Sequence, residues 1–251
     1  MKKHIPNLIT LGNLFCGIIA TIYAVEKAFD MAALFVVLGI LLDFFDGFAA
    51  RLLGVSGELG KQLDSLADVV TSGVVPGIIM FQLLALNTFE GSFEEIETIT
   101  EYGLQFAPIQ FLGLLLTLGA CYRLAKFNID TRQTDSFIGL PTPAMSLFII
   151  SLPLIKMQTD LYFVEILLQN KYVLICITLC LTFVMNAEIP LFSLKFKEYS
   201  IKNNWIKYIF LLASILLIVT TKYASIPLII ILYIVLSVIA NSKSKETAKL
   251  S

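Results

Sequence analysis

The feature that most limits the fold of this chain is a series of long apolar runs separated by short polar stretches. Of its residues 57% are hydrophobic and 15% are charged, and the mean hydropathy is +0.85. About 20 consecutive apolar residues in a helix cross a bilayer, and a helix satisfies its own backbone polar groups there. The sequence therefore predicts an all-α integral membrane protein.

Eight apolar runs are candidate transmembrane helices. They are bounded by charged or turn-forming residues, and the fifth and sixth are the shortest. Together they predict one polytopic catalytic domain over residues 1–240, followed by a short polar cytoplasmic tail at 241–251 without regular structure. The predicted spans are 5–25, 31–53, 63–86, 106–127, 141–158, 172–187, 205–220 and 225–240.

Lysine and arginine are divided unevenly between the two sides of this map. If the amino terminus is cytoplasmic, only Lys27, Lys156, Lys171 and Lys222 of the 18 basic residues fall outside. This positive-inside bias predicts that both termini face the cytoplasm. The formal net charge of -1 provides no basic field, so nucleic acid is not an expected partner.

Four aspartates lie where this topology places the cytoplasmic ends of the second and third spans. Asp43 and Asp46 share one helix face, and Asp64 and Asp68 share another, so both pairs are predicted to point into one pocket. Carboxylates this close repel one another and would take up protons unless cations neutralised them. Two hard divalent cations, Mg²⁺ or Mn²⁺, fit such oxygen ligands.

The residues beside the aspartates favour a phosphate ester as the ligand. Gly47 and Gly60 remove side chains where a ligand or a helix would approach the backbone. Arg51, one turn beyond Gly47, offers a planar fork of donors suited to a pyrophosphate.

Two other interpretations of the acidic residues remain open. Intramembrane carboxylates also line ion or proton paths, which would make this chain an ion-coupled transporter or a channel. An ion path, however, has no use for the glycine and the arginine beside the acids. An inactive helical scaffold would leave four repelling carboxylates unexplained.

The spacing of these residues follows the pattern D-x-x-D-G-x-x-A-R, eight residues, G-x-x-x-D-x-x-x-D. This pattern resembles the signature of the CDP-alcohol phosphatidyltransferases, membrane enzymes that replace the CMP of a CDP-linked lipid with an alcohol. The resemblance implies a two-metal site between helices at the cytoplasmic face, and a homodimer. The matching positions are Asp43, Asp46, Gly47, Ala50, Arg51, Gly60, Asp64 and Asp68.

By this resemblance the four aspartates hold the metal ions, and Asp68 also accepts the proton of the alcohol. Gly47 and Arg51 contact the CDP group of the lipid. The segment IPNLIT at 5–10 is similar to the opening of the family, where Asn7 and Thr10 hydrogen-bond the nucleotide. A helix that starts with Pro6 in its first turn explains either residue equally well.

One loop position departs from the family pattern. Ser56 lies where relatives place a hydroxyl near the nucleotide, but the next residue is Gly57, where serine or threonine is expected. The nucleotide contact from this loop is therefore in doubt.

Several longer segments are similar to phosphatidylserine synthases of the bacterial and archaeal membrane type. They are NLFCGIIA, GKQLDSLADVVTSG, RLAKFN and FIGLPTPAMS, at residues 13–20, 60–73, 123–128 and 137–146. The similarity implies an enzyme of the prokaryotic cytoplasmic membrane that converts CDP-diacylglycerol and L-serine into phosphatidylserine and CMP. Glycerol-3-phosphate and inositol remain alternative acceptors within the same chemistry.

A serine acceptor is zwitterionic and needs a cation for its carboxylate and acceptors for its ammonium group. Arg123, Lys126 and Asn128 lie at the cytoplasmic end of the fourth span and are the candidate serine-binding residues. Arg123 and Lys126 are equally well explained as positive-inside anchors of that span.

Overall fold

A computed structural model describes residues 4–55, 57–87, 107–130, 138–158, 162–192 and 201–250. Within these ranges the chain is helical apart from short connections and one isolated antiparallel bridge between Ile138 and Pro190. The prediction of an all-α protein is confirmed.

The helices follow one another along the chain with short links, and an apolar helix occupies each of the eight predicted spans. They are α1 (His4–Val25), α2 (Phe29–Leu53), α3 (Glu58–Val69), the π-helical turn η1 (Val70–Val74), α4 (Val75–Leu86), the 3₁₀ helix η3 (Pro108–Leu114), α6 (Leu115–Ile129), α7 (Thr142–Gln158), α8 (Tyr162–Gln169), α9 (Lys171–Asn186), α10 (Ile201–Thr221), η4 (Lys222–Ala224) and α11 (Ser225–Leu250).

Five helical stretches in the described ranges are long and apolar enough to cross a membrane, and α7 and α9 are shorter apolar helices. The third stretch, Glu58–Leu86, runs through α3, η1 and α4, and the fifth, Asn204–Ala240, contains most of α10 and part of α11. These lengths are those of a multi-pass membrane protein.

The polar tail differs from its prediction. Instead of ending at residue 240, α11 continues to Leu250. The segment NSKSKETAKL contains neither glycine nor proline, and its lysines, glutamate, alanine and leucine are good helix formers, so nothing in it stops the preceding helix.

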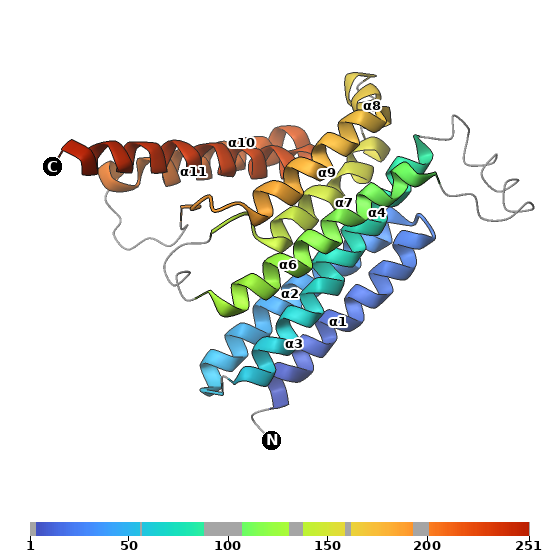
Figure 1. The fold of residues 1–251 in the computed structure, drawn as a ribbon, viewed down its shortest axis with the longest axis horizontal. Helices are drawn as coiled ribbons and strands as arrows, with labels where there is room; N and C mark the ends of the chain where they lie inside the picture. The colour runs from blue at the N-terminus through green and yellow to red at the C-terminus, as the bar shows by residue number, and fades with distance from the viewer. Residues whose placement is uncertain are drawn as a thin grey trace, which may run out of the picture.

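The first three helices make one end of the molecule, which we call the site end: the first turns of α1, the last turns of α2 and the first turns of α3. Gly54 ends α2 in the left-handed region with φ of 62°, and its N–H bonds back to Ala50 O and Arg51 O. This cap reverses the chain into α3. Helix α1 contacts both α2 and α3, so it forms one wall of the space that they share (Figure 1).

The apolar core lies further along the bundle, around α4 and α7. Ile79, Met80 and Leu84 of α4 and Met145 and Ile149 of α7 are fully buried. In Figure 1 the paired helices α10 and α11 lie obliquely across the other helices, and the contacts of α11 reach α7. The core thus holds the bundle together away from the site end.

Candidate active site

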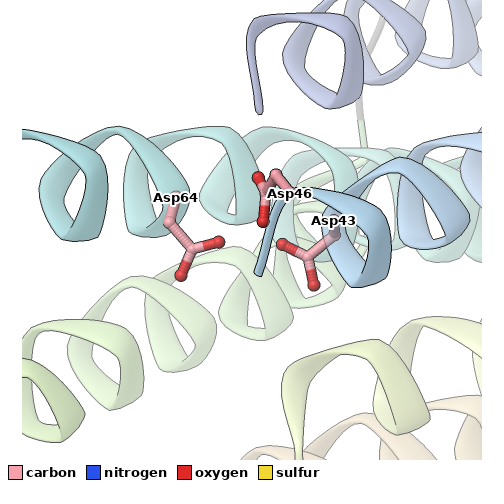
Figure 2. A group of neighbouring side chains, drawn as sticks. All are labelled: Asp43, Asp46 and Asp64. Carbon is pink, nitrogen blue, oxygen red and sulfur yellow. The ribbon is translucent and has the colours of Figure 1, made fainter. Parts of the chain in front are cut away.

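Three carboxylates meet between α2 and α3. Asp43, Asp46 and Asp64 each offer an oxygen, and these atoms lie within 4.8 Å of one another. Figure 2 shows the three side chains turned toward one another, two from α2 and one from α3. The three-residue spacing in α2 places Asp43 and Asp46 on one face, as the sequence predicts.

The hydrogen bonding of this cluster fits a hard cation. Asp43 Oδ1 is buried and has no hydrogen-bond partner among the described residues. A buried oxygen of this kind is costly unless a positive charge or a donor satisfies it. Asp46 is more constrained, because Thr10 Oγ1 lies 2.5 Å from its Oδ2 and 3.0 Å from Pro6 O, and the single hydroxyl proton can reach either acceptor. Three clustered carboxylates with an unsatisfied oxygen suit Mg²⁺ or Mn²⁺.

Asp68 lies apart from this group. It is 9% exposed and lies one turn further along α3 than Asp64. Asn13 Nδ2 donates to its Oδ1 at 3.2 Å. The structure therefore brings three of the four predicted ligands within 4.8 Å of one another and gives the fourth a hydrogen-bond partner from α1.

A cavity of about 260 Å³ opens beside the carboxylate cluster. Its walls come from the start of α1, the end of α2 and the start of α3. A Cβ added to Gly47 would meet no atom within 4 Å, so this position leaves open space for a ligand. The lining residues are Pro6, Asn7, Thr10, Asp46, Gly47, Ala50, Val55, Gly57, Gly60, Lys61 and Asp64.

Most of the predicted nucleotide-binding residues border this cavity, with two exceptions. Arg51 lies in the last turn of α2, outside the lining, with an exposed side chain that forms no hydrogen bond or ion pair within the described ranges. Ser56 lies outside the described residues.

A second, much smaller cavity lies between α6 and α9. Its volume of about 10 Å³ has room for a single water. Arg123, Lys126 and Asn186 line it, and two of their buried atoms, Arg123 Nε and Asn186 Oδ1, have no hydrogen-bond partner among the described residues. Lys126 Nζ is 3.4 Å from Glu188 Oε1.

The third predicted serine-binding residue has a different partner. Asn128 Nδ2 donates to Ser65 Oγ at 2.8 Å, and the Asn128 carbonyl accepts from Lys61 Nζ. Asn128 thus joins α6 to α3 and does not line the small cavity.

Sequence reasoning missed several polar residues that the fold brings to the site. Asn13 and Thr71 are fully buried, Lys61 borders the large cavity, and Asn186 borders the small one. An asparagine inside an apolar span is costly and marks a polar contact. That signal was available for Asn13, but it does not identify the partner.

Comparison with known proteins agrees with the geometry. A CDP-alcohol phosphatidyltransferase family model matches residues 3–185. The CDP-diacylglycerol–serine O-phosphatidyltransferase of Bacillus subtilis (strain 168) is 37% identical over 155 residues, 59% of this chain and 76% of the relative. The enzyme of the same name from Helicobacter pylori (strain ATCC 700392 / 26695) is 30% identical over 215 residues, 84% of this chain and 79% of the relative.

An archaeal relative is more distant. The archaetidylserine synthase of Methanothermobacter thermautotrophicus is 28% identical over 161 residues, 62% of this chain and 60% of the relative. The family match covers α1 through most of α9 and therefore includes every residue of the carboxylate cluster and of the two cavities except Asn186 and Ala187. The chain belongs to the CDP-alcohol phosphatidyltransferase family.

Proposed function

We propose that this protein transfers the phosphatidyl group of CDP-diacylglycerol to the hydroxyl of L-serine, giving phosphatidylserine and CMP. The observation that carries the proposal is the cluster of Asp43, Asp46 and Asp64 beside a cavity, in a chain of the CDP-alcohol phosphatidyltransferase family. The printed names of the bacterial relatives supply the serine acceptor. The predicted topology would place the site at the cytoplasmic face of the membrane.

In this proposal the three clustered aspartates hold two divalent cations, Mg²⁺ or Mn²⁺. When bound, such ions neutralise charge on the attacked phosphoryl group and on the departing CMP. Asp68 accepts the proton of the serine hydroxyl as the oxygen–phosphorus bond to serine forms and the phosphorus–oxygen bond to CMP breaks. Thr10 fixes the orientation of Asp46 by donating to its Oδ2.

The larger cavity is the proposed site of the CDP group. Asn7 and Gly47 line it, and the open space at Gly47 allows the diphosphate to approach the backbone of α2. Arg51, one turn further along α2, has an exposed guanidinium fork that forms no hydrogen bond or ion pair with any described residue, and we propose that it binds the diphosphate. Ser56 remains a candidate contact from the α2–α3 loop.

For the acceptor, we propose that serine binds at the small cavity between α6 and α9, which would have to widen to admit it. Arg123 Nε would donate to the serine carboxylate, with Lys126 nearby, and Asn186 Oδ1 would accept from the ammonium group. Asn186 replaces Asn128 in this role because Asn186 lines the small cavity and Asn128 does not. Helices α3 and α6, which carry Asp68 and Arg123, are in contact, so an acceptor held at Arg123 would lie on the side of α6 that faces the helix of the proposed base.

The test is CMP release by the purified protein with CDP-diacylglycerol and each of serine, glycerol-3-phosphate and inositol, with and without a chelator. We expect release with serine and a divalent cation, and none after chelation. Release with inositol or glycerol-3-phosphate but not with serine would overturn the acceptor. Ion flux in proteoliposomes without any dependence on CDP-lipid would instead support a transporter or channel.

The base is tested separately with Asp68→Asn. We expect loss of turnover while the protein folds and still binds CDP-diacylglycerol, since the amide keeps the shape but cannot take the proton. Wild-type turnover in Asp68→Asn would refute the assignment of the base.

A further inference from the structure

We propose that Asn13 and Thr71 form a buried clamp that positions the Asp68 carboxylate for proton acceptance. This inference rests on the proposed role of Asp68 and adds two positioning residues from α1 and η1 to it. Neither residue borders either of the two cavities described above, so both would act through Asp68 and not by contact with substrate.

The clamp is a continuous chain of hydrogen bonds. Asn13 Nδ2 donates to Asp68 Oδ1 at 3.2 Å, and Thr71 Oγ1 donates to Asn13 Oδ1 at 2.8 Å. Asn13 and Thr71 are both 0% exposed. Polar groups buried so completely are retained only where their hydrogen bonds are satisfied, and such networks hold side chains in one arrangement.

The chemistry of the three side chains fixes the direction of the chain. An ionised carboxylate only accepts, so Asn13 must turn its NH₂ group toward Asp68 and its oxygen toward Thr71. The Thr71 hydroxyl also lies 3.2 Å from the backbone Asn13 O, so Thr71 contacts both the side chain and the main chain of Asn13. If the Asn13 amide flipped, its oxygen would face the Asp68 carboxylate and the bond to Asp68 would be lost.

Two glycines leave room for this contact. A Cβ on Gly17 would lie 2.4 Å from Thr71 Oγ1, and a Cβ on Gly39 would lie 2.7 Å from Thr71 Cγ2 and 2.8 Å from Asn13 Oδ1. All three distances are too short for real atoms. Glycine in α1 and in α2 therefore allows Thr71 and Asn13 to meet where the three segments cross.

The π-helical turn η1 begins two residues after Asp68 and includes Thr71. Such turns change the register of a helix and occur often at functional sites. On its other side, the Gly73 carbonyl accepts from Thr117 Oγ1 of α6 at 2.9 Å. The turn is thus bonded to α1 on one side and to α6 on the other.

The clamp matters because a carboxylate can take the proton of the substrate hydroxyl only when one of its oxygens is held facing that hydroxyl. Asn13 binds Oδ1 from the α1 side, which leaves Oδ2 for the substrate hydroxyl.

The experiment compares Thr71→Val, which removes the hydroxyl at constant shape, with Thr71→Ser, which keeps it. We expect Thr71→Val to lower kcat about 10- to 100-fold, the usual cost of losing a group that orients a functional ligand. The KM values for both substrates should change less than about twofold, since neither residue contacts substrate. Thr71→Ser should restore most of kcat, and Asn13→Leu should lower it at least as much as Thr71→Val.

Thr117→Val is the matched control, because it removes a hydroxyl bond to the same turn without touching Asn13 or Asp68. It should lower the thermal unfolding temperature as Thr71→Val does but leave kcat near wild type. Equal kcat losses in Thr117→Val and Thr71→Val, or wild-type kcat in Thr71→Val, would overturn the clamp. If Asn13→Leu does not fold, the comparison of Thr71→Val with Thr71→Ser still tests the clamp.

The two proposals fail in different ways. Asp68→Asn without turnover, together with full activity in Thr71→Val and Asn13→Leu, overturns the clamp alone. Wild-type turnover in Asp68→Asn overturns both the base and the clamp that serves it.

Discussion

Polar side chains are used differently at the site end and in α10. At the site end and just beyond it, side chains bond to side chains of other helices, as in Thr10 to Asp46 and Asn13 to Asp68. In α10, the hydroxyls of Ser214, Thr220 and Thr221 bond to carbonyls of their own helix. Bonds of the first kind fix distant groups in one geometry, whereas the second kind only satisfies a hydroxyl in an apolar setting.

The two regions also differ in how much apolar surface they expose. Leu212 and Val219 of α10 are each 76% exposed, as suits a lipid-facing helix. The family match ends at residue 185, before α10 begins. The family match and the carboxylate cluster therefore lie in the part of the chain from α1 to α9, and α10 and α11 add apolar surface to it.

The largest expected difference between the two regions comes from the carboxylate cluster. Asp43→Asn should lower turnover by at least about 10²- to 10³-fold, the cost of removing one preorganised electrostatic group from a transition state. The rate of CMP release measures the turnover of the variant. Asp30→Asn is the control, since Asp30 is exposed in the first turn of the same helix, and it should keep wild-type turnover.

A smaller effect is expected at the proposed acceptor cavity. Asn186→Leu removes the oxygen proposed to accept from the serine ammonium, so KM for serine should rise about 10-fold while KM for CDP-diacylglycerol is unchanged. Asn128→Leu breaks a bond between α6 and α3 and should change stability more than KM for serine. A larger rise in KM for serine in Asn128→Leu than in Asn186→Leu would indicate that Asn128, and not Asn186, binds serine.

At the edge of the larger cavity, Arg51→Lys should weaken the apparent affinity for CDP-diacylglycerol severalfold. One ammonium cannot reproduce the planar fork of a guanidinium on a diphosphate. Substrate titrations at saturating serine measure the change, and an unchanged affinity would exclude Arg51 from the site.

The smallest effects concern stability in detergent. Gly39→Ala should destabilise the fold by about 1–3 kcal/mol, because the new methyl group overlaps Thr71 and Asn13. Leu212→Ala in α10 should change it by less than about 0.5 kcal/mol, since the side chain is exposed. Thermal unfolding of the two variants measures both losses of stability. Equal losses in Gly39→Ala and Leu212→Ala would show that the two regions do not differ in this respect.

Much of the fold follows from the sequence because its causes are local. Long apolar runs predict the helices, and the three-residue spacing of Asp43 and Asp46 predicts their common face. The helical continuation of α11 to Leu250 was missed because the polarity of this tail was taken to indicate an irregular segment, although its residues favour a helix.

The parts of the site that escaped prediction depend on contacts between distant segments. Spacing within α3 gives Asp64 and Asp68 similar directions, but it does not show that Asn13 binds Asp68 while Asp64 joins Asp43 and Asp46. The π-helical turn and the pairing of Arg123 with Asn186 across a cavity likewise arise only when helices pack together.

The central claim is that Asp43, Asp46 and Asp64 hold divalent cations for phosphatidyl transfer. Its most direct test is to titrate the purified protein with Mn²⁺ in the presence of CDP-diacylglycerol and count bound ions by electron paramagnetic resonance. We predict two bound ions per chain in the wild type and in Asp30→Asn, and weakened or lost binding in Asp43→Asn and Asp64→Asn. The same number of ions bound with equal affinity in all four proteins would contradict the claim.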